Sequence, residues 1–125
     1  EEAKQLPEYY VAPYLGSYFY RINVTKKPFD DPRVRKALAL SIDRTQITKD
    51  LLKAGQVPAT WFVPPMPTYE PAKGLAYDRE AARRLLAEAG YKDGKGFPAG
   101  VELLYNTLEA HKVIAENVVQ QWREN

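Results

Sequence analysis

Aromatic and β-branched residues gather in two stretches near the amino end of the chain. Residues 9–11 and 17–24 have the composition that strands prefer. In the longer stretch, alternate positions share one face, because successive side chains of a strand point to opposite sides. The members of this face are Tyr18, Tyr20, Ile22 and Val24. The pattern predicts two strands, with Gly16 permitting a bend between them.

Apolar residues then recur at helical spacing in four stretches, each preceded by a residue suited to capping a helix. The predicted helices, with the capping residue first, are Asp31 to Ile42, Asp43 to Gly55, Asp78 to Gly90 and Thr107 to Trp122. Pro32 suits the first position of the first helix, and glycine suits the end of the second and third. The residues expected to face the core are Val34, Ala37, Leu38, Ile42, Ile47, Leu51, Leu52, Ala81, Ala82, Leu85, Leu86, Ala89, Ile114, Val118 and Trp122.

Two connecting regions complete the pattern. Residues 56–71 contain prolines at positions 58, 64, 65, 67 and 71, which predicts a loop rather than a helix or a central strand. The loop also carries large apolar residues, so parts of it are expected to lie against the core: Trp61, Phe62, Met66 and Tyr69. Residues 101–105 are predicted to form a further strand.

The resulting order of strands and helices indicates an α/β fold, or an α+β fold, with a small mixed sheet flanked by helices. Two or three strands make a thin sheet for a core of this size. A further strand is therefore expected after the last predicted helix, and the chain is interpreted as one partial domain over residues 1–125.

Composition narrows the classes of function. With 125 residues, 45% hydrophobic and 27% charged, the chain can bury the core of one domain. A net charge of +2 from 18 basic and 16 acidic residues argues against nucleic acid, which is recognised by a strongly basic face. The absence of cysteine excludes disulfides and thiol chemistry. No apolar run approaches the roughly 20 residues that span a bilayer.

Motifs for catalysis are missing from the sequence. His111 is the single histidine, and neither G-x-S-x-G nor H-E-x-x-H occurs. The neighbouring carboxylates Asp30 and Asp31 fit a turn and a helix cap. The sequence therefore predicts no enzyme, no metal site and no cofactor. Taken alone, Asn106 reads as a turn residue and His111 as a surface residue.

Four blocks of the sequence together resemble a known family. They are PYLGSYFYRINVTKKPFDDPRVRKALALSIDR (13–44), GQVPATWFVPP (55–65), DREAARRLLAEAGY (78–91) and VELLYNTLEAHKVIAENVVQQW (101–122). Their order and spacing resemble those of the solute-binding proteins of peptide/nickel-type ABC importers (family 5). The resemblance is strongest to the oligopeptide-binding, OppA-like members.

The resemblance implies a type II periplasmic-binding-protein fold, in which two α/β lobes close over a ligand at a hinge. Residues 1–125 would then form the first half of the C-terminal lobe, with Pro13 to Tyr20 as the strand leaving the hinge. Tyr18 and Tyr20 are expected to line the peptide site. The stretch that contains Asn106 and His111 is similar to that of the oligopeptide-binding members, whose histidine lies near the peptide's C-terminal end. A helix N-terminus and an imidazole both suit an anion.

The function that the resemblance implies is capture of oligopeptides outside the cytoplasm, in the periplasm or at the cell surface, and delivery to an ABC transporter permease. Contact with a membrane is then expected only through an anchor or the permease. The isolated chain is expected to bind peptides negligibly, because half a cleft cannot enclose a ligand. It is also expected to self-associate as a dimer through unpaired strand edges. Two alternatives remain open: a ligand-sensing module of a regulator, and a binding protein for nickel, haem or an oligosaccharide.

Overall fold

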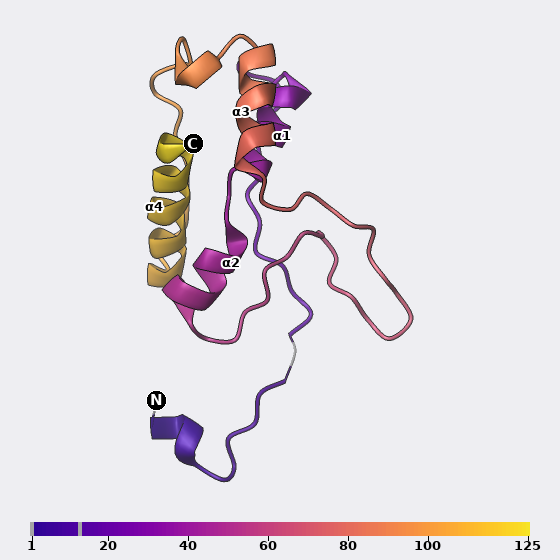
Figure 1. Cartoon of the computed structure of the whole chain (residues 1–125). Helices are drawn as coiled ribbons and strands as arrows, with labels where there is room; N and C mark the ends of the chain where they lie inside the picture. The colour runs from indigo at the N-terminus through magenta and orange to yellow at the C-terminus, as the bar shows by residue number, and fades with distance from the viewer. Residues whose placement is uncertain (1, 13) are drawn as a thin grey trace.

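The computed structural model describes residues 2–12 and 14–125, and it consists of helices joined by long extended segments (Figure 1). The helical elements are η1 (Glu2–Gln5), α1 (Pro32–Leu40), α2 (Arg44–Gln46), η2 (Ile47–Leu52), α3 (Arg79–Glu88), η3 (Lys92–Gly94) and α4 (Glu109–Glu124). The second predicted helix is thus formed by α2 and by η2, which is π-helical. No helix in the described part of the chain has the length and apolar character needed to cross a membrane.

The predicted strands do not form. Residues 9–11, 17–24 and 101–105 contain no β-ladder, and the one bridge among the described residues joins Met66 to Tyr69 within a tight turn. A strand exists only where a neighbouring strand accepts its backbone hydrogen bonds, and the described residues supply no such neighbour here. Pro13, at the start of the expected hinge strand, lies outside the described residues.

Three of the four predicted helix caps are confirmed. A carboxylate oxygen accepts a hydrogen bond from a backbone N–H of the first turn at Asp31 (Arg33 N, 2.8 Å), Asp43 (Gln46 N, 3.0 Å) and Asp78 (Ala81 N, 2.9 Å). Each bond satisfies a donor that the helix itself leaves without a partner. The starts of α1, α2 and α3 are therefore fixed by local sequence.

The fourth cap is wrong. Thr107 does not cap α4, and the N-cap residue Leu108 offers no side-chain acceptor. The Oδ1 atom of Asn106 accepts the Leu108 backbone N–H instead, at 3.2 Å. The side chain that organises this helix start lies one residue earlier than predicted, because Asn can accept a hydrogen bond from a backbone N–H two residues on.

The predicted glycine end is confirmed for α3 but not for η2. Gly90 follows α3 with φ of +92°, and the Tyr91 N–H bonds to the Leu86 carbonyl at 2.8 Å, as expected for a glycine stop. Gly55 was the expected end of η2, but Lys53 takes the left-handed position with φ of +52°. The N–H of Lys53 bonds to the Thr48 carbonyl at 3.1 Å, so the wider π-helical turn ends the helix two residues early.

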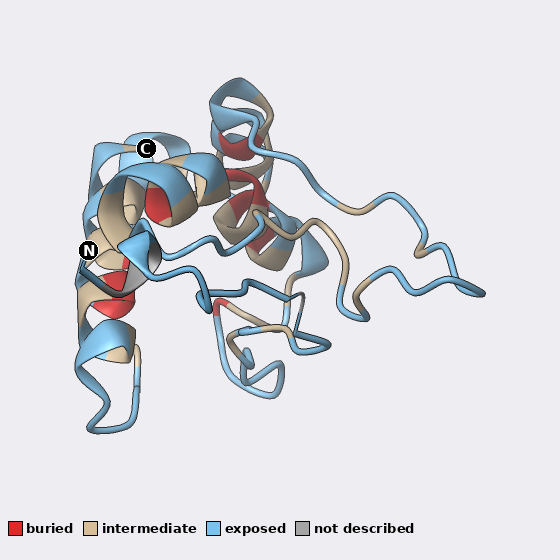
Figure 2. Ribbon diagram, turned by 90° about the horizontal axis from the view of Figure 1, so that it is seen from below, coloured by how far each residue is buried: buried red, intermediate tan, exposed pale blue. Residues whose placement is uncertain are grey.

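Two hydrophobic clusters form the core. The α1–α3 cluster contains buried Ala37, Leu40 and Ala82, with α1 and α3 lying side by side (Figure 1). The α4 cluster contains buried Ile47, Ile114 and Val118, surrounded by half-buried Tyr20, Ile42, Leu51, Leu52, Leu103 and Trp122. Buried positions fall mainly on the helices (Figure 2). Nine of the expected core residues are only half-buried: Leu38, Ile42, Leu51, Leu52, Ala81, Leu85, Leu86, Ala89 and Trp122. Leu40 and Ala115 are buried residues that the pattern missed.

The proline-rich region is a loop, as predicted, but most of its large apolar side chains do not lie against the core. It projects from the helices (Figure 1), and Phe62, Met66 and Tyr69 are exposed while Trp61 is half-buried. Prolines keep this segment out of helices and ladders, and Phe62 packs edge-on against Phe19 at 4.7 Å rather than in either buried cluster. The backbone comes close to itself where residues 60 and 74 meet. A Cβ on Gly74 would lie 1.5 Å from the Thr60 carbonyl oxygen, so this position requires glycine.

Candidate functional site

The four residues predicted to bind ligand lie together in the structure. The rings of Tyr18 and His111 are stacked with centroids 4.3 Å apart and planes 24° from parallel. The ring of Tyr20 meets that of Tyr18 edge-on at 5.4 Å. Asn106 reaches His111 through a 2.7 Å contact between its Oδ1 and the imidazole Nδ1. We call this group of Tyr18, Tyr20, Asn106 and His111 the aromatic–imidazole cluster.

Three parts of the chain build the aromatic–imidazole cluster. The extended segment 17–23 supplies the two tyrosines, the turn before α4 supplies Asn106, and the first turn of α4 supplies His111. Their meeting is a tertiary event, since residues 18 and 111 are far apart in sequence. Tyr20 anchors the segment by packing against the α4 cluster.

Burial determines the chemistry of Tyr20. Desolvation, followed by the hydrogen bond and charge of Tyr18, raises the pKa of the Tyr20 phenol above its usual range. The hydroxyl of Tyr18 donates toward that of Tyr20 over 3.5 Å. Tyr20 is therefore a neutral phenol, able to donate or accept a hydrogen bond.

The surroundings of His111 are partly open. Tyr18 is exposed, Tyr20 and His111 are half-buried, and Asn106 is exposed. Lys112 and Glu109, its neighbours on α4, form a loose 4.0 Å ion pair. The start of α4 adds backbone N–H groups and the positive end of the helix dipole. The cluster can thus offer aromatic faces, a neutral phenol and an imidazole to a ligand.

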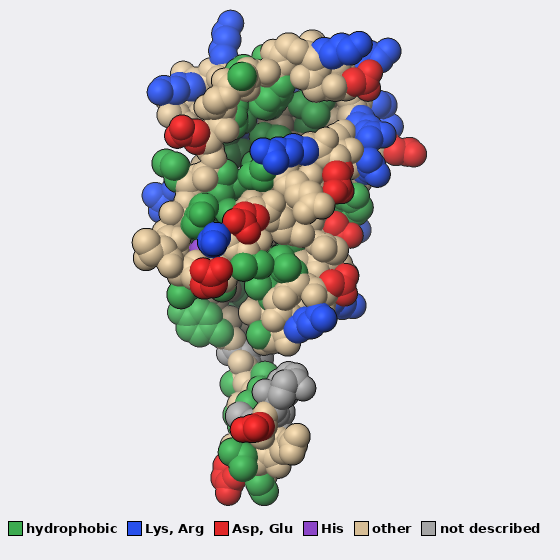
Figure 3. All heavy atoms as spheres, turned by 90° about the vertical axis from the view of Figure 1, so that its left-hand side faces the viewer, with side chains coloured by type: hydrophobic (Ala, Val, Ile, Leu, Met, Phe, Trp, Pro, Cys, Tyr) green, Lys and Arg blue, Asp and Glu red, His purple; other side chains and the backbone are tan. Residues whose placement is uncertain are grey.

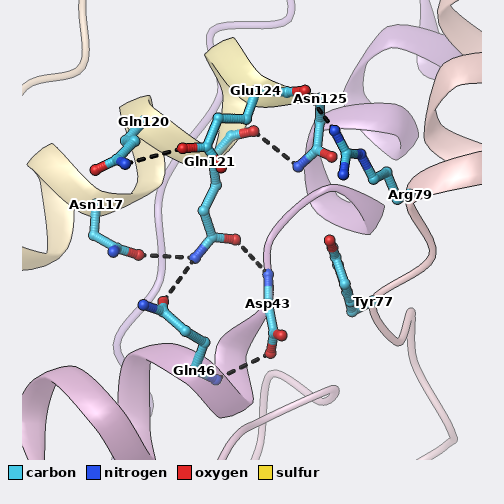
Figure 4. Close-up of a pocket in the computed structure, with 9 residues that line it drawn as sticks. All are labelled: Asp43, Gln46, Tyr77, Arg79, Asn117, Gln120, Gln121, Glu124 and Asn125. Atoms are coloured by element: carbon cyan, nitrogen blue, oxygen red, sulfur yellow. Dashed lines mark hydrogen bonds between the residues drawn. The ribbon is translucent and has the colours of Figure 1, made fainter.

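A second, polar hollow was not predicted from the sequence. Its volume is about 230 Å³, and it lies between α2, α4 and the start of α3 (Figure 4). At its centre the Gln121 amide accepts from the Asp43 N–H at 2.6 Å and donates to Gln46 at 3.1 Å and to Asn117 at 2.8 Å. These bonds join α4 to the start of α2, which is a structural role. No sequence pattern marks Gln121, because its partner in α2 is 75 residues away.

Charged groups outside the cluster also join helices. Arg33 donates to Asp31 and to the Glu88 carbonyl at the end of α3. Its hydrogen bonds lower the pKa of the Asp31 carboxyl, and Asp31 in turn raises the pKa of Arg33. Arg44 donates to the carbonyls of Ala39 and Ile42, and burial lowers its pKa. Throughout residues 2–12 and 14–125, no three acidic or histidine side chains gather as metal ligands would.

Comparisons with known proteins identify the family. The sequence model described as "Bacterial extracellular solute-binding proteins, family 5 Middle" matches residues 1–124. The periplasmic oligopeptide-binding protein OppA of Haemophilus influenzae is 41% identical over 98% of this chain and 24% of its own length.

Solved structures agree with this match. A periplasmic oligopeptide-binding protein (OppAIV) of Borrelia burgdorferi superposes with a TM-score of 0.85 at 35% identity, covering 98% of this chain and 25% of the other. Haemophilus influenzae OppA in complex with RPPGFSPFR superposes with a TM-score of 0.74 at 37% identity, over the same shares of the two chains.

These likenesses fix the class of fold and the family. The structural neighbours are type II periplasmic binding proteins of the α/β class, although the described part of this chain forms no sheet of its own. The chain spans about a quarter of the length of the relatives it matches. The match over almost the whole chain nevertheless shows that it belongs to the bacterial extracellular solute-binding proteins of family 5.

Proposed function

We propose that this chain forms one wall of the ligand site in an oligopeptide-binding protein that supplies an ABC transporter permease. The observation that carries the proposal is the aromatic–imidazole cluster, in which Tyr18 stacks on His111 at 4.3 Å. The chain that contains this cluster is 41% identical to a relative named as an oligopeptide-binding protein. Aromatic faces bury apolar side chains of a peptide, and polar groups beside them fix its orientation.

The roles of the four residues follow from their chemistry. Tyr18 and Tyr20 would contact peptide side chains, and Asn106 and His111 would face the peptide's C-terminal end. A carboxylate there gains from the imidazole and from the N-terminus of α4. Catalysis has no part in this function: the cluster contains no nucleophile paired with a base.

The place of the chain in a whole protein is also part of the proposal. Residues 1–125 would form the first half of the C-terminal lobe, and the ligand would bind between this lobe and another that closes over it. The relatives are named as periplasmic proteins, which favours action in the periplasm or at the cell surface. The closed, loaded protein would then dock on the permease.

Calorimetric titration with tri- to pentapeptides tests the function. The full-length protein that contains this chain should bind them, and Tyr18→Ala and His111→Ala should each weaken binding about tenfold or more, as loss of a central contact does. Tyr10→Ala is the matched control, because Tyr10 is exposed and lies outside the cluster. The isolated 125-residue chain should bind negligibly. Unchanged affinity in both cluster variants would refute the proposed site.

We further propose that the isolated chain self-associates. Apolar side chains along the extended segments are exposed, among them Phe19, Ile22, Leu104 and Tyr105, and Figure 3 shows hydrophobic groups over the face that α4 occupies. Exposed apolar surface and unpaired extended backbone both favour contact between copies. Light scattering at increasing concentration should give the mass of a dimer, and a monomer at every concentration would contradict this.

A further inference from the structure

The hydrogen bonds of Asn106 determine which nitrogen of His111 carries a proton. The Oδ1 atom of Asn106 accepts the Leu108 backbone N–H at 3.2 Å, and that N–H can only donate. The side-chain oxygen, rather than the amide nitrogen, must therefore occupy this position. The same oxygen lies 2.7 Å from Nδ1 of His111. Because an amide oxygen can only accept, Nδ1 must be the donor and must carry hydrogen.

The second nitrogen of the ring is then free for a ligand. In neutral imidazole one nitrogen is a donor and the other an acceptor, so a proton on Nδ1 leaves a lone pair on Nε2. Nε2 makes no hydrogen bond within the described residues. The ring cannot turn easily, because Tyr18 covers its face at 4.3 Å while Asn106 holds one edge.

We infer that Asn106 is a positioning residue that holds His111 in the tautomer with hydrogen on Nδ1. The protonation of Nε2 then decides whether the ring binds a hydrogen-bond donor of a ligand or a carboxylate. Neutral His111 accepts a hydrogen bond from a ligand N–H or O–H at Nε2. It binds a carboxylate well only after Nε2 takes up a proton and becomes a donor. This selection rests on the proposed peptide-binding function, whereas the tautomer does not.

The charged and titratable groups near the His111 ring do not place an unpaired negative charge beside it. From segment 17–23, Tyr18 stacks on the ring and Tyr20 contacts Tyr18 edge-on. Burial, with Tyr18 beside it, raises the pKa of Tyr20, which stays neutral. On α4, Glu109 and Lys112 pair with each other at 4.0 Å. An incoming carboxylate accepts a hydrogen bond from Nε2 only when that nitrogen is protonated, so its binding should strengthen as pH falls.

Nuclear magnetic resonance of the imidazole nitrogens tests the tautomer without a ligand. His111 is the only histidine in the chain, so the spectrum has a single assignment. At alkaline pH, Nδ1 should show the shift of a protonated nitrogen and Nε2 that of an unprotonated one. Asn106→Ala should abolish this preference. Asn117→Ala, which removes an amide that bonds Gln121 on the same helix, should preserve it.

An unprotonated Nδ1 in the wild-type chain, or an unchanged ratio of tautomers in Asn106→Ala, would overturn the inference. A variant that failed to fold would be recognised from its loss of helical circular dichroism. Asn106→Asp then provides the second test, because a carboxylate at this position keeps an acceptor on Nδ1 and should retain the Nδ1–H form.

Binding by the full-length protein tests the selection. The probes are one tripeptide with a free C-terminal carboxylate and the same tripeptide with a C-terminal amide, titrated at pH 5.5 and pH 8. The ratio of acid to amide affinity should be about tenfold higher at pH 5.5 than at pH 8, because only a protonated Nε2 donates a charge-assisted hydrogen bond to the carboxylate. His111→Gln should remove that rise. In Asn106→Asp, the preference for the peptide with a free carboxylate should persist to a higher pH than in the wild type.

The outcomes separate the two proposals. A pH-independent ratio in a protein that binds both peptides would overturn the selection by His111. Failure to bind either peptide would overturn the proposed function, while the tautomer measured on the unliganded chain would still support or refute the role of Asn106.

Discussion

The α1–α3 cluster and the α4 cluster are both buried, yet they are assembled from different kinds of segment. The α1–α3 cluster joins two helices, and the small residues Ala37 and Ala82 are both buried in it. The α4 cluster collects side chains from helices and from two extended segments, through Tyr20 and Leu103. Helices form their own backbone hydrogen bonds, whereas an extended segment has its place only through tertiary contacts. The aromatic–imidazole cluster rests on the second arrangement, so its geometry depends on distant parts of the chain.

The largest expected effect is loss of packing inside the α4 cluster. Ile114→Ala should lower the free energy of unfolding by about 3 kcal/mol, since it removes buried carbons and leaves a cavity. Urea denaturation followed by circular dichroism measures this. Leu108→Ala, at an exposed position beside the same helix, is the control. Equal effects of the two substitutions would show that the α4 cluster is not a packed core.

Overpacking of the α1–α3 cluster should come next. Ala82 is 1% exposed and lies against α1, so Ala82→Leu should cost about 2 kcal/mol of stability. Ala87→Leu places the same side chain on the exposed face of α3 and should stay within about 0.5 kcal/mol. The same denaturation measurement compares them. If Ala82→Leu were neutral, the two helices would not be in close contact.

A smaller effect tests whether the segment 101–105 belongs to the α4 cluster. Leu103 is half-buried against this cluster, while the adjacent Leu104 is 81% exposed. Leu103→Ala should therefore cost about 1 kcal/mol, and Leu104→Ala should be close to neutral. Thermal unfolding of the two variants gives the comparison directly. Equal, negligible losses would mean that the segment contributes nothing to the core.

The smallest expected effect is the pH dependence of the start of α1. Hydrogen bonds from Arg33 lower the pKa of the Asp31 carboxyl relative to the unfolded chain. A lowered pKa contributes stability that is present above the unfolded pKa, near 3.9, and is lost as pH falls through the folded value. Unfolding midpoints measured between pH 2 and pH 6 should drop less steeply in Asp31→Asn than in the wild type. Asp30→Asn, without a cap role, is the control, and an identical slope for Asp31→Asn would contradict the role of this carboxylate.

Local signals account for what could be predicted. The caps at Asp31, Asp43 and Asp78 depend on a side chain and a backbone N–H two or three residues on, so a single short stretch contains both partners. The failed cap at Thr107 marks the limit of such reasoning. Asn106 takes that place while also bonding His111, a choice between neighbouring polar residues that helical spacing does not reveal.

The candidate site could be named from the sequence only through resemblance. Composition and spacing left Asn106 as a turn residue and His111 as a surface residue, and the resemblance joined them to Tyr18 and Tyr20. The structure brings these four together, with the rings of Tyr18 and His111 stacked. Their contact with a peptide remains a prediction. Gln121 escaped notice altogether, because its amide acts on residues of another helix.

The sequence by itself determined where the main helices lie, the caps of three of them and the family, because each depends on patterns within short blocks of residues. Tertiary structure alone decided that residues 17–23 and 101–105 pack as extended segments on helices rather than as a sheet. The physical reason is that a helix completes its hydrogen bonds internally, whereas a strand needs a neighbour that its own sequence does not specify. The same dependence on distant contacts placed Tyr18 over His111, and with it the chemistry of the site.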